Sequence, residues 1–266
     1  MRPGDTHLSM TQEFSFIEVG GQRARTRLSG DGDTVVVLHG WGGRIESMTP
    51  VIDCLSIAFR VVALDLPGFG ESPPPRSVWG TEEYAAFVLS VMNSLGIERA
   101  HFVGHSFGAK TALSLSAAHP EMIAKMVLQG SSGLRSAPSL SVRAKRLASR
   151  VARPLDRAGR AGRWLKKALY ERIASRDYEN AGELREILVK VVNEDLTDIL
   201  PLVQAPTLLV WGTADDAVPV AHGKVMERLI PDAGLVLFEN AGHFAYLDEP
   251  ERFCLITRHF FDPSVT

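Results

Sequence analysis

Short runs of β-branched and other apolar residues recur along the chain and alternate with segments of helical periodicity. Residues 14–19 and 23–28 alternate polar and apolar positions around Gly20-Gly21, which predicts an opening hairpin with one face toward water. The later runs are continuously apolar, which indicates strands covered on both faces in a parallel sheet. These later runs cover residues 34–38, 60–64, 100–103, 125–128, 207–211 and 235–238.

Segments with helical spacing lie between these runs, at intervals that fit crossover connections. The predicted helices cover residues 45–57, 82–95, 111–119, 221–229 and 251–261. Strands that alternate with helices in this way are typical of a doubly wound, mostly parallel sheet. We therefore predict an α/β fold.

One long segment, residues 134–203, breaks the alternation because it holds no comparable β-branched run. We expect it to be helical throughout and to form an inserted cap. The core domain would then comprise residues 1–133 and 204–266.

The cap segment is strongly basic, since Arg135 to Arg176 hold thirteen Lys or Arg and only two acidic residues. Four of these cations recur at three- and four-residue spacing along one helical face: Arg143, Arg146, Arg150 and Arg153. Such a stripe could attract an anionic substrate, a membrane surface or RNA. A solvated outer helix face is the simpler interpretation.

Chain length and net charge indicate which classes of partner to expect. A chain of 266 residues is within the range of one α/β domain that carries an insertion. A formal net charge of −2 with 23% charged residues gives no overall attraction to nucleic acid or acidic membranes. We expect a small-molecule partner and no nucleic acid, and the pattern leaves the oligomeric state open.

The two cysteines and the N-terminal residues indicate in which cellular compartment the protein is expected. Cys54 and Cys254 are the only cysteines, and their wide separation predicts neither a disulfide framework nor a zinc site. We expect two core thiols. Residues 1–7 hold no apolar segment of signal-peptide length, and no later run approaches a membrane span. A cytoplasmic protein without stable membrane insertion is the expectation.

A Gly-x-Ser-x-Gly pentapeptide, residues 104–108, joins the strand at 100–103 to a helix. A serine that turns the chain in one residue adopts a strained backbone conformation, which glycine neighbours on either side permit. Its hydroxyl would stand above the sheet edge, and the first amides of the helix would face a developing oxyanion. Ser106 is therefore the candidate nucleophile.

The same residues come close to a phosphate-binding loop. Gly104 to Thr111 depart from the pattern G-x-x-x-x-G-K-T only at Ala109. That loop needs glycine there so that its amides can wrap a phosphate. Nucleotide binding is therefore the weaker hypothesis for this segment.

A serine nucleophile requires a neighbouring base and a carboxylate that orients the base. Two later strands are followed by loops with these groups, Asp215 and Asp216 in one and His243 in the other. Since an open parallel sheet binds ligands at the carboxyl ends of its strands, we expect Ser106, Asp215 and His243 to converge. Asp216 stays an alternative to Asp215, and both could instead cap the following helix.

Three other histidines compete for the role of base, namely His39, His105 and His222. An isolated histidine is more often a packed or surface residue, and His105 lies inside the elbow beside the serine. The glycine-rich loop at residues 38–43 ends a buried strand, so its backbone can approach a ligand closely. The backbone amides of Trp41 and Phe107 are candidates for an oxyanion hole, although the loop could also be a simple turn.

Five segments taken together resemble the successive signatures of the α/β-hydrolase family. They are His39-Gly40-Trp41-Gly42, Asp65-Leu66-Pro67-Gly68-Phe69-Gly70-Glu71-Ser72, Gly104-His105-Ser106-Phe107-Gly108, Trp211-Gly212-Thr213-Ala214-Asp215 and Gly242-His243. The resemblance covers about residues 14–261 apart from the cap. It implies an eight-stranded sheet, a helical cap after the sixth strand and a triad of Ser106, Asp215 and His243, with no metal and no organic cofactor.

The resemblance also implies an activity. A serine nucleophile departs from the haloalkane dehalogenase and epoxide hydrolase branches, which carry aspartate there, and the loop after His39 lacks the proline iminopeptidase pattern. We expect hydrolysis of a small carboxylic ester or thioester through an acyl-enzyme. A carbon–carbon bond hydrolase, lactonase, perhydrolase or lyase remains an alternative, because the cap sets the substrate. An alternative of another class is a ligand receptor with a vestigial triad.

Overall fold

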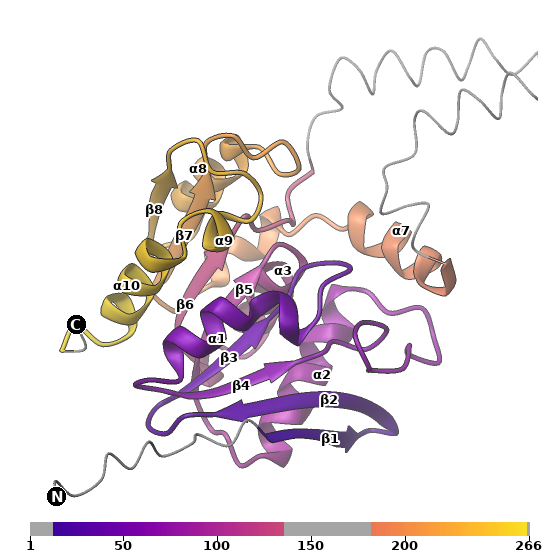
Figure 1. Cartoon of the computed structure of the whole chain (residues 1–266). Helices are drawn as coiled ribbons and strands as arrows, with labels where there is room; N and C mark the ends of the chain where they lie inside the picture. Colours follow the sequence, from indigo (N-terminus) through magenta and orange to yellow (C-terminus); the bar gives the residue numbers. More distant parts are fainter. Residues whose placement is uncertain (1–12, 136–181, 265–266) are drawn as a thin grey trace, which may run out of the picture.

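An eight-stranded sheet forms the centre of the computed structural model, which describes residues 13–135 and 182–264 (Figure 1). The strand order is β1-β2-β4-β3-β5-β6-β7-β8. The strands are β1 (Glu13–Val19), β2 (Gln22–Ser29), β3 (Thr34–Leu38), β4 (Arg60–Leu64), β5 (Ala100–His105), β6 (Ile123–Gln129), β7 (Thr207–Gly212) and β8 (Ala233–Phe238). β1 and β2 form the expected hairpin, β2 pairs antiparallel with β4, and the remaining neighbours are parallel. The predicted α/β class and the mostly parallel sheet are confirmed.

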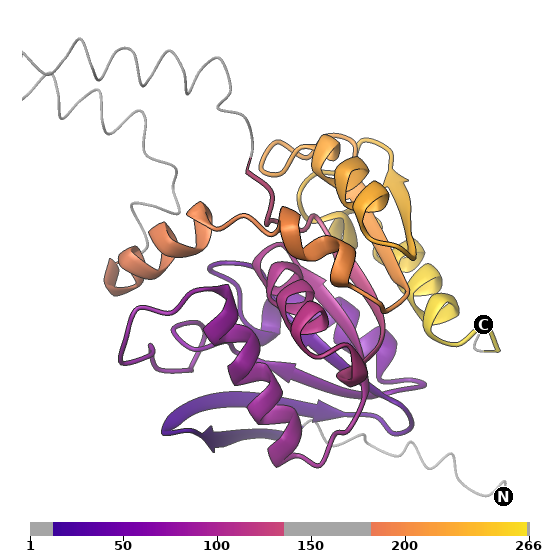
Figure 2. The same cartoon turned by 180° about the vertical axis from the view of Figure 1, so that it is seen from behind.

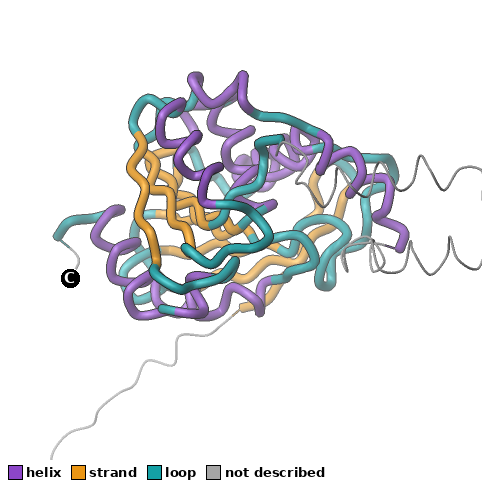
Figure 3. The backbone as a smooth tube through the Cα atoms, turned by 90° about the horizontal axis from the view of Figure 1, so that it is seen from above, coloured by secondary structure: helices purple, strands orange, loops and turns teal. Residues whose placement is uncertain are grey.

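Helices cover both faces of this sheet, as the tube seen from above shows (Figure 3). One face carries α1 (Thr49–Leu55), α9 (Ala245–Asp248) and α10 (Pro250–Phe261). The other carries α2 (Thr81–Ser94), α3 (Phe107–Ala118) and α8 (Val220–Leu229), seen in front of the sheet in Figure 2.

The continuous apolar runs follow from this double cover. In β3, Val35 and Val37 are buried against the α1 and α10 side, while Val36 and Leu38 are buried against α2 and α3. Fully burying one such side chain contributes about 1.5–3 kcal/mol, so a central strand gains from both faces. A strand of this kind has no polar face, which is why its sequence does not alternate.

The helix expected over residues 45–57 differs from the observed structure in detail. A short 3₁₀ helix, η1 (Ile45–Met48), comes first, and α1 then runs from Thr49 to Leu55. Pro50 lies in the first turn of α1, where its missing N–H costs no intrahelical bond. The amide of Phe59 bonds the carbonyl of Leu55 at 2.9 Å and turns the chain toward β4.

The cap prediction reaches beyond the part of the chain that the structure describes. Residues 136–181, including the four-arginine stripe, lie outside the described residues. Residues 182–203 contain η4 (Gly182–Leu184), α7 (Arg185–Asn193) and η5 (Thr197–Leu202), in keeping with the helical expectation. The division into a core and a cap domain stays a prediction. No helix within the described ranges is both long and apolar enough to cross a membrane.

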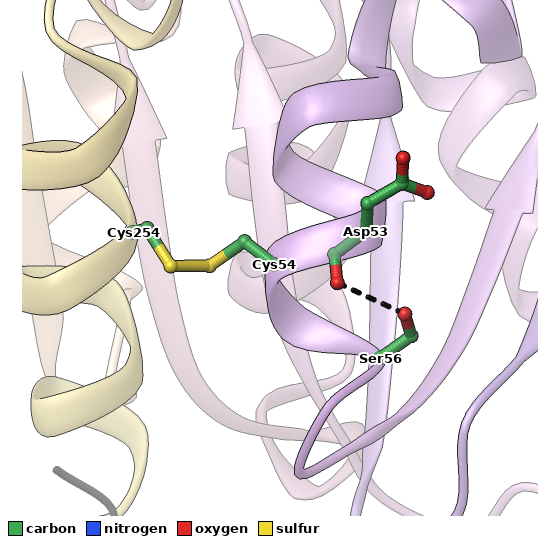
Figure 4. The surroundings of a disulfide bond; sticks show 4 residues. All are labelled: Asp53, Cys54, Ser56 and Cys254. Carbon is green, nitrogen blue, oxygen red and sulfur yellow. Dashed lines mark hydrogen bonds between the residues drawn. A yellow bond between two sulfur atoms is a disulfide. The ribbon is translucent and has the colours of Figure 1, made fainter. Parts of the chain in front are cut away.

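Cys54 and Cys254 form a disulfide that joins α1 to α10, with 6.0 Å between the Cα atoms (Figure 4). The prediction of two core thiols was therefore wrong. The prediction was based on the separation of 200 residues along the chain. In the structure the two helices pack on the same face of the sheet, which brings the cysteines together. Disulfides persist mainly in oxidising compartments, so this bond does not favour the cytoplasmic location, which stays a prediction.

Removing this disulfide should destabilise the fold substantially. In the chain-entropy model, a cross-link that closes a loop of about 200 residues stabilises by up to about 5 kcal/mol. We expect the double variant C54A/C254A to unfold at lower guanidinium concentration than the wild type. Dithiothreitol should lower the midpoint of the wild type and leave the double variant unchanged, and a wild type indifferent to the reductant would contradict the prediction.

Candidate active site

Ser106 occupies the predicted corner, directly after β5 and one residue before α3 begins. Its φ of 49° and ψ of −103° are a backbone conformation that residues other than glycine rarely adopt. A Cβ on Gly104 would lie 2.6 Å from the backbone of Ala109, and one on Gly108 would lie 2.4 Å from the carbonyl oxygen of Leu38. Both glycines therefore allow α3 to pack closely on the strands, and this packing holds the serine in its turn.

Asp215 and His243 meet across the loops that follow β7 and β8. Nδ1 of His243 lies 2.8 Å from Oδ2 of Asp215, whose side chain is completely buried. The other carboxylate oxygen accepts hydrogen bonds from the amides of Ala217 at 2.9 Å and Val218 at 2.8 Å. Since the carboxylate only accepts, Nδ1 carries the proton in the neutral ring, and Nε2 keeps its lone pair.

Gly130 makes room for this pair. It follows β6 with a φ of +54°, and a Cβ there would lie 3.1 Å from Nδ1 of His243 and 3.3 Å from Oδ2 of Asp215. A side chain would both crowd the histidine–aspartate contact and strain the backbone. The sequence alone gives no signal for this glycine, because its role depends on which distant loops approach it.

The two adjacent aspartates have different surroundings. Asp215 faces His243 and the loop amides, whereas Asp216 is exposed and lines the cavity described next. Of the two alternatives that the sequence leaves open, Asp215 is the carboxylate in contact with the imidazole.

A cavity of about 800 Å³ lies at this end of the sheet, and both Ser106 and His243 line it. That volume suits a drug-sized ligand. Its apolar wall consists of Trp41, Phe107, Leu134, Leu188, Val191, Val192, Ala217, Val218 and Phe244. The chain thus presents a serine and an imidazole to a space with mainly apolar walls.

Trp41 and Phe107 line the same cavity as Ser106. Their rings pack edge to face, with 5.5 Å between centroids. Phe107 is the first residue of α3, and the first amides of a helix have no acceptor within that helix. The role of the Trp41 and Phe107 amides as an oxyanion hole stays a prediction.

The other three candidate histidines are less suited to act as the general base. His39 donates from Nδ1 to the carbonyl of Gly40 at 2.7 Å and accepts from the amide of Leu66 at 3.0 Å, so both ring nitrogens are used within the fold. Burial lowers the pKa of His39 and lowers that of His105 to about 3. A group with so low a pKa is a weak proton acceptor at neutral pH. His222 lines the cavity, and burial lowers its pKa as well.

Lys110, the cation of the phosphate-loop alternative, serves the fold instead. Its ammonium group is buried, donates to the carbonyl of Val191 at 2.5 Å and lies 3.3 Å from Oε2 of Glu194. The Glu194 carboxylate also accepts from the amide and the hydroxyl of Thr81 at the start of α2. Desolvation lowers the pKa of Lys110, and Glu194 opposes that shift. These contacts connect α7 to α2 and α3. Because the Lys110 ammonium already binds a carbonyl and a carboxylate of the protein, it is less able to bind a phosphate, which weakens the nucleotide hypothesis.

The described residues contain no group of three or more His, Cys, Asp or Glu side chains arranged to hold a metal ion. The cavity that Ser106 lines also presents the imidazole of His243, whose other ring nitrogen contacts the carboxylate of Asp215. These are the groups used in acyl transfer to a serine.

The chain is similar in sequence and in structure to known hydrolases. The family profile described as alpha/beta hydrolase fold matches residues 33–157 and 143–250. A 2-hydroxy-6-oxo-6-phenylhexa-2,4-dienoate hydrolase of Comamonas testosteroni is 31% identical over 255 residues, which cover 85% of this chain and 86% of that protein. A pimeloyl-[acyl-carrier protein] methyl ester esterase of Aeromonas hydrophila is 28% identical over 87% of this chain and 96% of its own. Among solved structures, a membrane phospholipase A described as a bacterial virulence factor matches with a TM-score of 0.77 and 25% identity, covering 95% of this chain and 86% of that one.

Proposed function

This chain belongs to the α/β-hydrolase fold family, and on that premise we propose that it is a serine hydrolase of small carboxylic esters or thioesters. The observation that carries the proposal is the 2.8 Å contact between His243 and the buried Asp215, beside the cavity that Ser106 also lines. The partner in this proposal is a small molecule with an acyl group.

The proposed reaction begins when Nε2 of His243 takes the proton of the Ser106 hydroxyl as its oxygen attacks the substrate carbonyl. Asp215 keeps the Nδ1 proton in place and stabilises the imidazolium that forms. The amides of Trp41 and Phe107 would donate to the oxyanion of the tetrahedral intermediate. His243 then protonates the leaving alcohol or thiol, and an acyl-enzyme remains. A water molecule activated by the same imidazole releases the acid.

The lining supports an uncharged acyl group over an anionic one. Lys110 is the one lysine or arginine among the described lining residues, and Glu194 neutralises it at 3.3 Å. An anionic substrate would find little compensation on this part of the wall, and its desolvation would oppose binding. Neutral, fairly apolar esters fit these residues better.

A second candidate is hydrolysis of a carbon–carbon bond on the same three residues. It is favoured by the 31% identity to the dienoate hydrolase of Comamonas testosteroni, which covers most of both chains. Lactonase and perhydrolase chemistry would use the same groups, as would a ligand receptor that turns over slowly.

Covalent labelling tests the proposal directly. A fluorophosphonate probe should add one label, and peptide mass spectrometry should locate it at Ser106. A panel of neutral esters, lactones and vinylogous diketone acids would then separate the candidate reactions. A label elsewhere, or none, would reject a serine hydrolase, and labelling with turnover far below the roughly 10 per second of typical enzymes would favour the receptor.

A further inference from the structure

The backbone carbonyl of His243 accepts hydrogen bonds from two buried side chains. Nε2 of Gln129 lies 3.0 Å from this oxygen, and Nε2 of His105 also lies 3.0 Å from it. The exposed fractions of these donors are 1% for Gln129 and 3% for His105. The carbonyl of the proposed base therefore accepts from two buried donors.

Gln129 also holds the proposed nucleophile. It is the last residue of β6, in register with His105 on β5 and Val210 on β7. Its own carbonyl accepts a hydrogen bond from the amide of Ser106 at 2.9 Å. One residue thus bonds the backbone of Ser106 through its main chain and the backbone of His243 through its side chain.

The protonation of His105 is determined by the same contact. A carbonyl oxygen can only accept, so Nε2 of His105 carries the hydrogen. The ring packs against Phe244 at 4.9 Å and Tyr246 at 5.3 Å between centroids. A Cβ on Gly40 would lie 2.6 Å from its Nδ1, so little space remains for another orientation.

We propose that Gln129 and His105 are positioning residues that aim the His243 imidazole at Ser106 by clamping its carbonyl. This inference rests on the proposed function. His243 lies in the loop between β8 and α9, where no ladder of strand or helix bonds orients it. A displacement of about 1 Å at a reacting group can cost about 100-fold in rate, so two rigid donors on this carbonyl bear directly on proton transfer.

The other half of the Gln129 amide points to the same role. Its Oε1 is buried without a hydrogen-bond partner among the described residues. A buried acceptor left unsatisfied lowers stability, so an apolar side chain of the same length would suit the core better. If Gln129 only filled space, its amide would bring a cost and no benefit.

The variant Gln129→Met separates positioning from packing. It keeps the main-chain bond to Ser106, removes the unsatisfied Oε1 and leaves His105 as a donor to the carbonyl. We expect a melting temperature equal to or above that of the wild type, a kcat lower by roughly 10- to 100-fold, and KM within about threefold. Q129M with unchanged kcat would overturn the proposal, as would a loss seen only in KM.

A matched control and a second variant complete the experiment. Thr207→Val removes a buried hydroxyl that bonds the carbonyl of Ala205 at 2.8 Å at the start of β7, so its kcat should match the wild type. H105F removes the other donor while keeping an aromatic ring. Because both donors share one acceptor, the double variant should lose more in kcat than the product of the single losses. Independent, multiplicative losses would contradict a shared clamp.

A spectroscopic measurement distinguishes failure of this inference from failure of the proposed function. The proton between His243 and Asp215 should give a downfield imidazole resonance in the wild type, and Q129M should broaden or shift it. If the wild type neither labels at Ser106 nor hydrolyses esters but the resonance responds, the function fails and the clamp stands. If the wild type is active while kcat and the resonance are unchanged in Q129M, the clamp alone fails.

Discussion

Replacing Ser106 by alanine should abolish ester hydrolysis, with kcat/KM falling by about 10⁴-fold or more. In the proposed reaction, Ser106 supplies the one protein atom that bonds to the acyl carbon, and without it no acyl-enzyme forms. The cavity walls and the His243–Asp215 contact remain in S106A, and substrate should still bind. Turnover of p-nitrophenyl acetate and labelling by the fluorophosphonate probe are the measurements.

Ser116→Ala provides the matched control for this loss. Ser116 lies on the same helix α3, is completely buried and is ten residues from the elbow serine. Its replacement should change kcat/KM by less than about threefold, since distant sites act independently. Full activity in S106A, or a comparable loss in S116A, would mean that the elbow serine is not the nucleophile.

Replacing Asp215 by asparagine should lower kcat by about 10³- to 10⁴-fold. Oδ1 of Asp215 accepts from the amides of Ala217 and Val218, so the amide oxygen of an asparagine would turn toward them. Its NH₂ group would then face Nδ1 of His243, which would have to accept the hydrogen bond. The ring proton would move to Nε2, and the imidazole could no longer take the Ser106 proton.

The adjacent aspartate gives the control for this prediction. Asp216 carries the same charge one residue later but is exposed at the cavity wall. D216N should lower kcat by less than about tenfold, because an exposed carboxylate is screened by water and salt more than a buried one. Steady-state kinetics of both variants decide between the aspartates, and a larger loss in D216N would assign the orienting role to Asp216.

The order of elements could be predicted from the sequence because each rests on a local pattern. Continuous β-branched runs marked strands buried on both faces, and the alternation around Gly20-Gly21 marked the hairpin of β1 and β2. The predicted boundaries were less accurate, as over residues 45–57, where a 3₁₀ turn precedes a helix that begins at Thr49. Helical spacing alone does not show where one helix ends and the next begins.

The loops of the candidate site could also be predicted, and for a topological reason. In a parallel sheet the carboxyl ends of all strands reach the same edge, so residues that follow different strands come together without knowledge of side-chain geometry. Ser106 after β5, Asp215 after β7 and His243 after β8 are of this kind. The choice between Asp215 and Asp216 needed the structure, because a tight turn sends adjacent side chains in different directions.

Periodicity and strand order are properties of the chain, so the amino-acid sequence was enough to predict the sheet, its helical cover and the three loops of the candidate site. Three contacts became visible only in the folded structure: the Cys54–Cys254 disulfide, the Lys110–Glu194 ion pair and the hydrogen bond from Gln129 to the carbonyl of His243. Each depends on which distant segments become neighbours and on the direction of a single side chain. Such contacts leave no repeating pattern in a sequence, because one residue on each side is enough to make them.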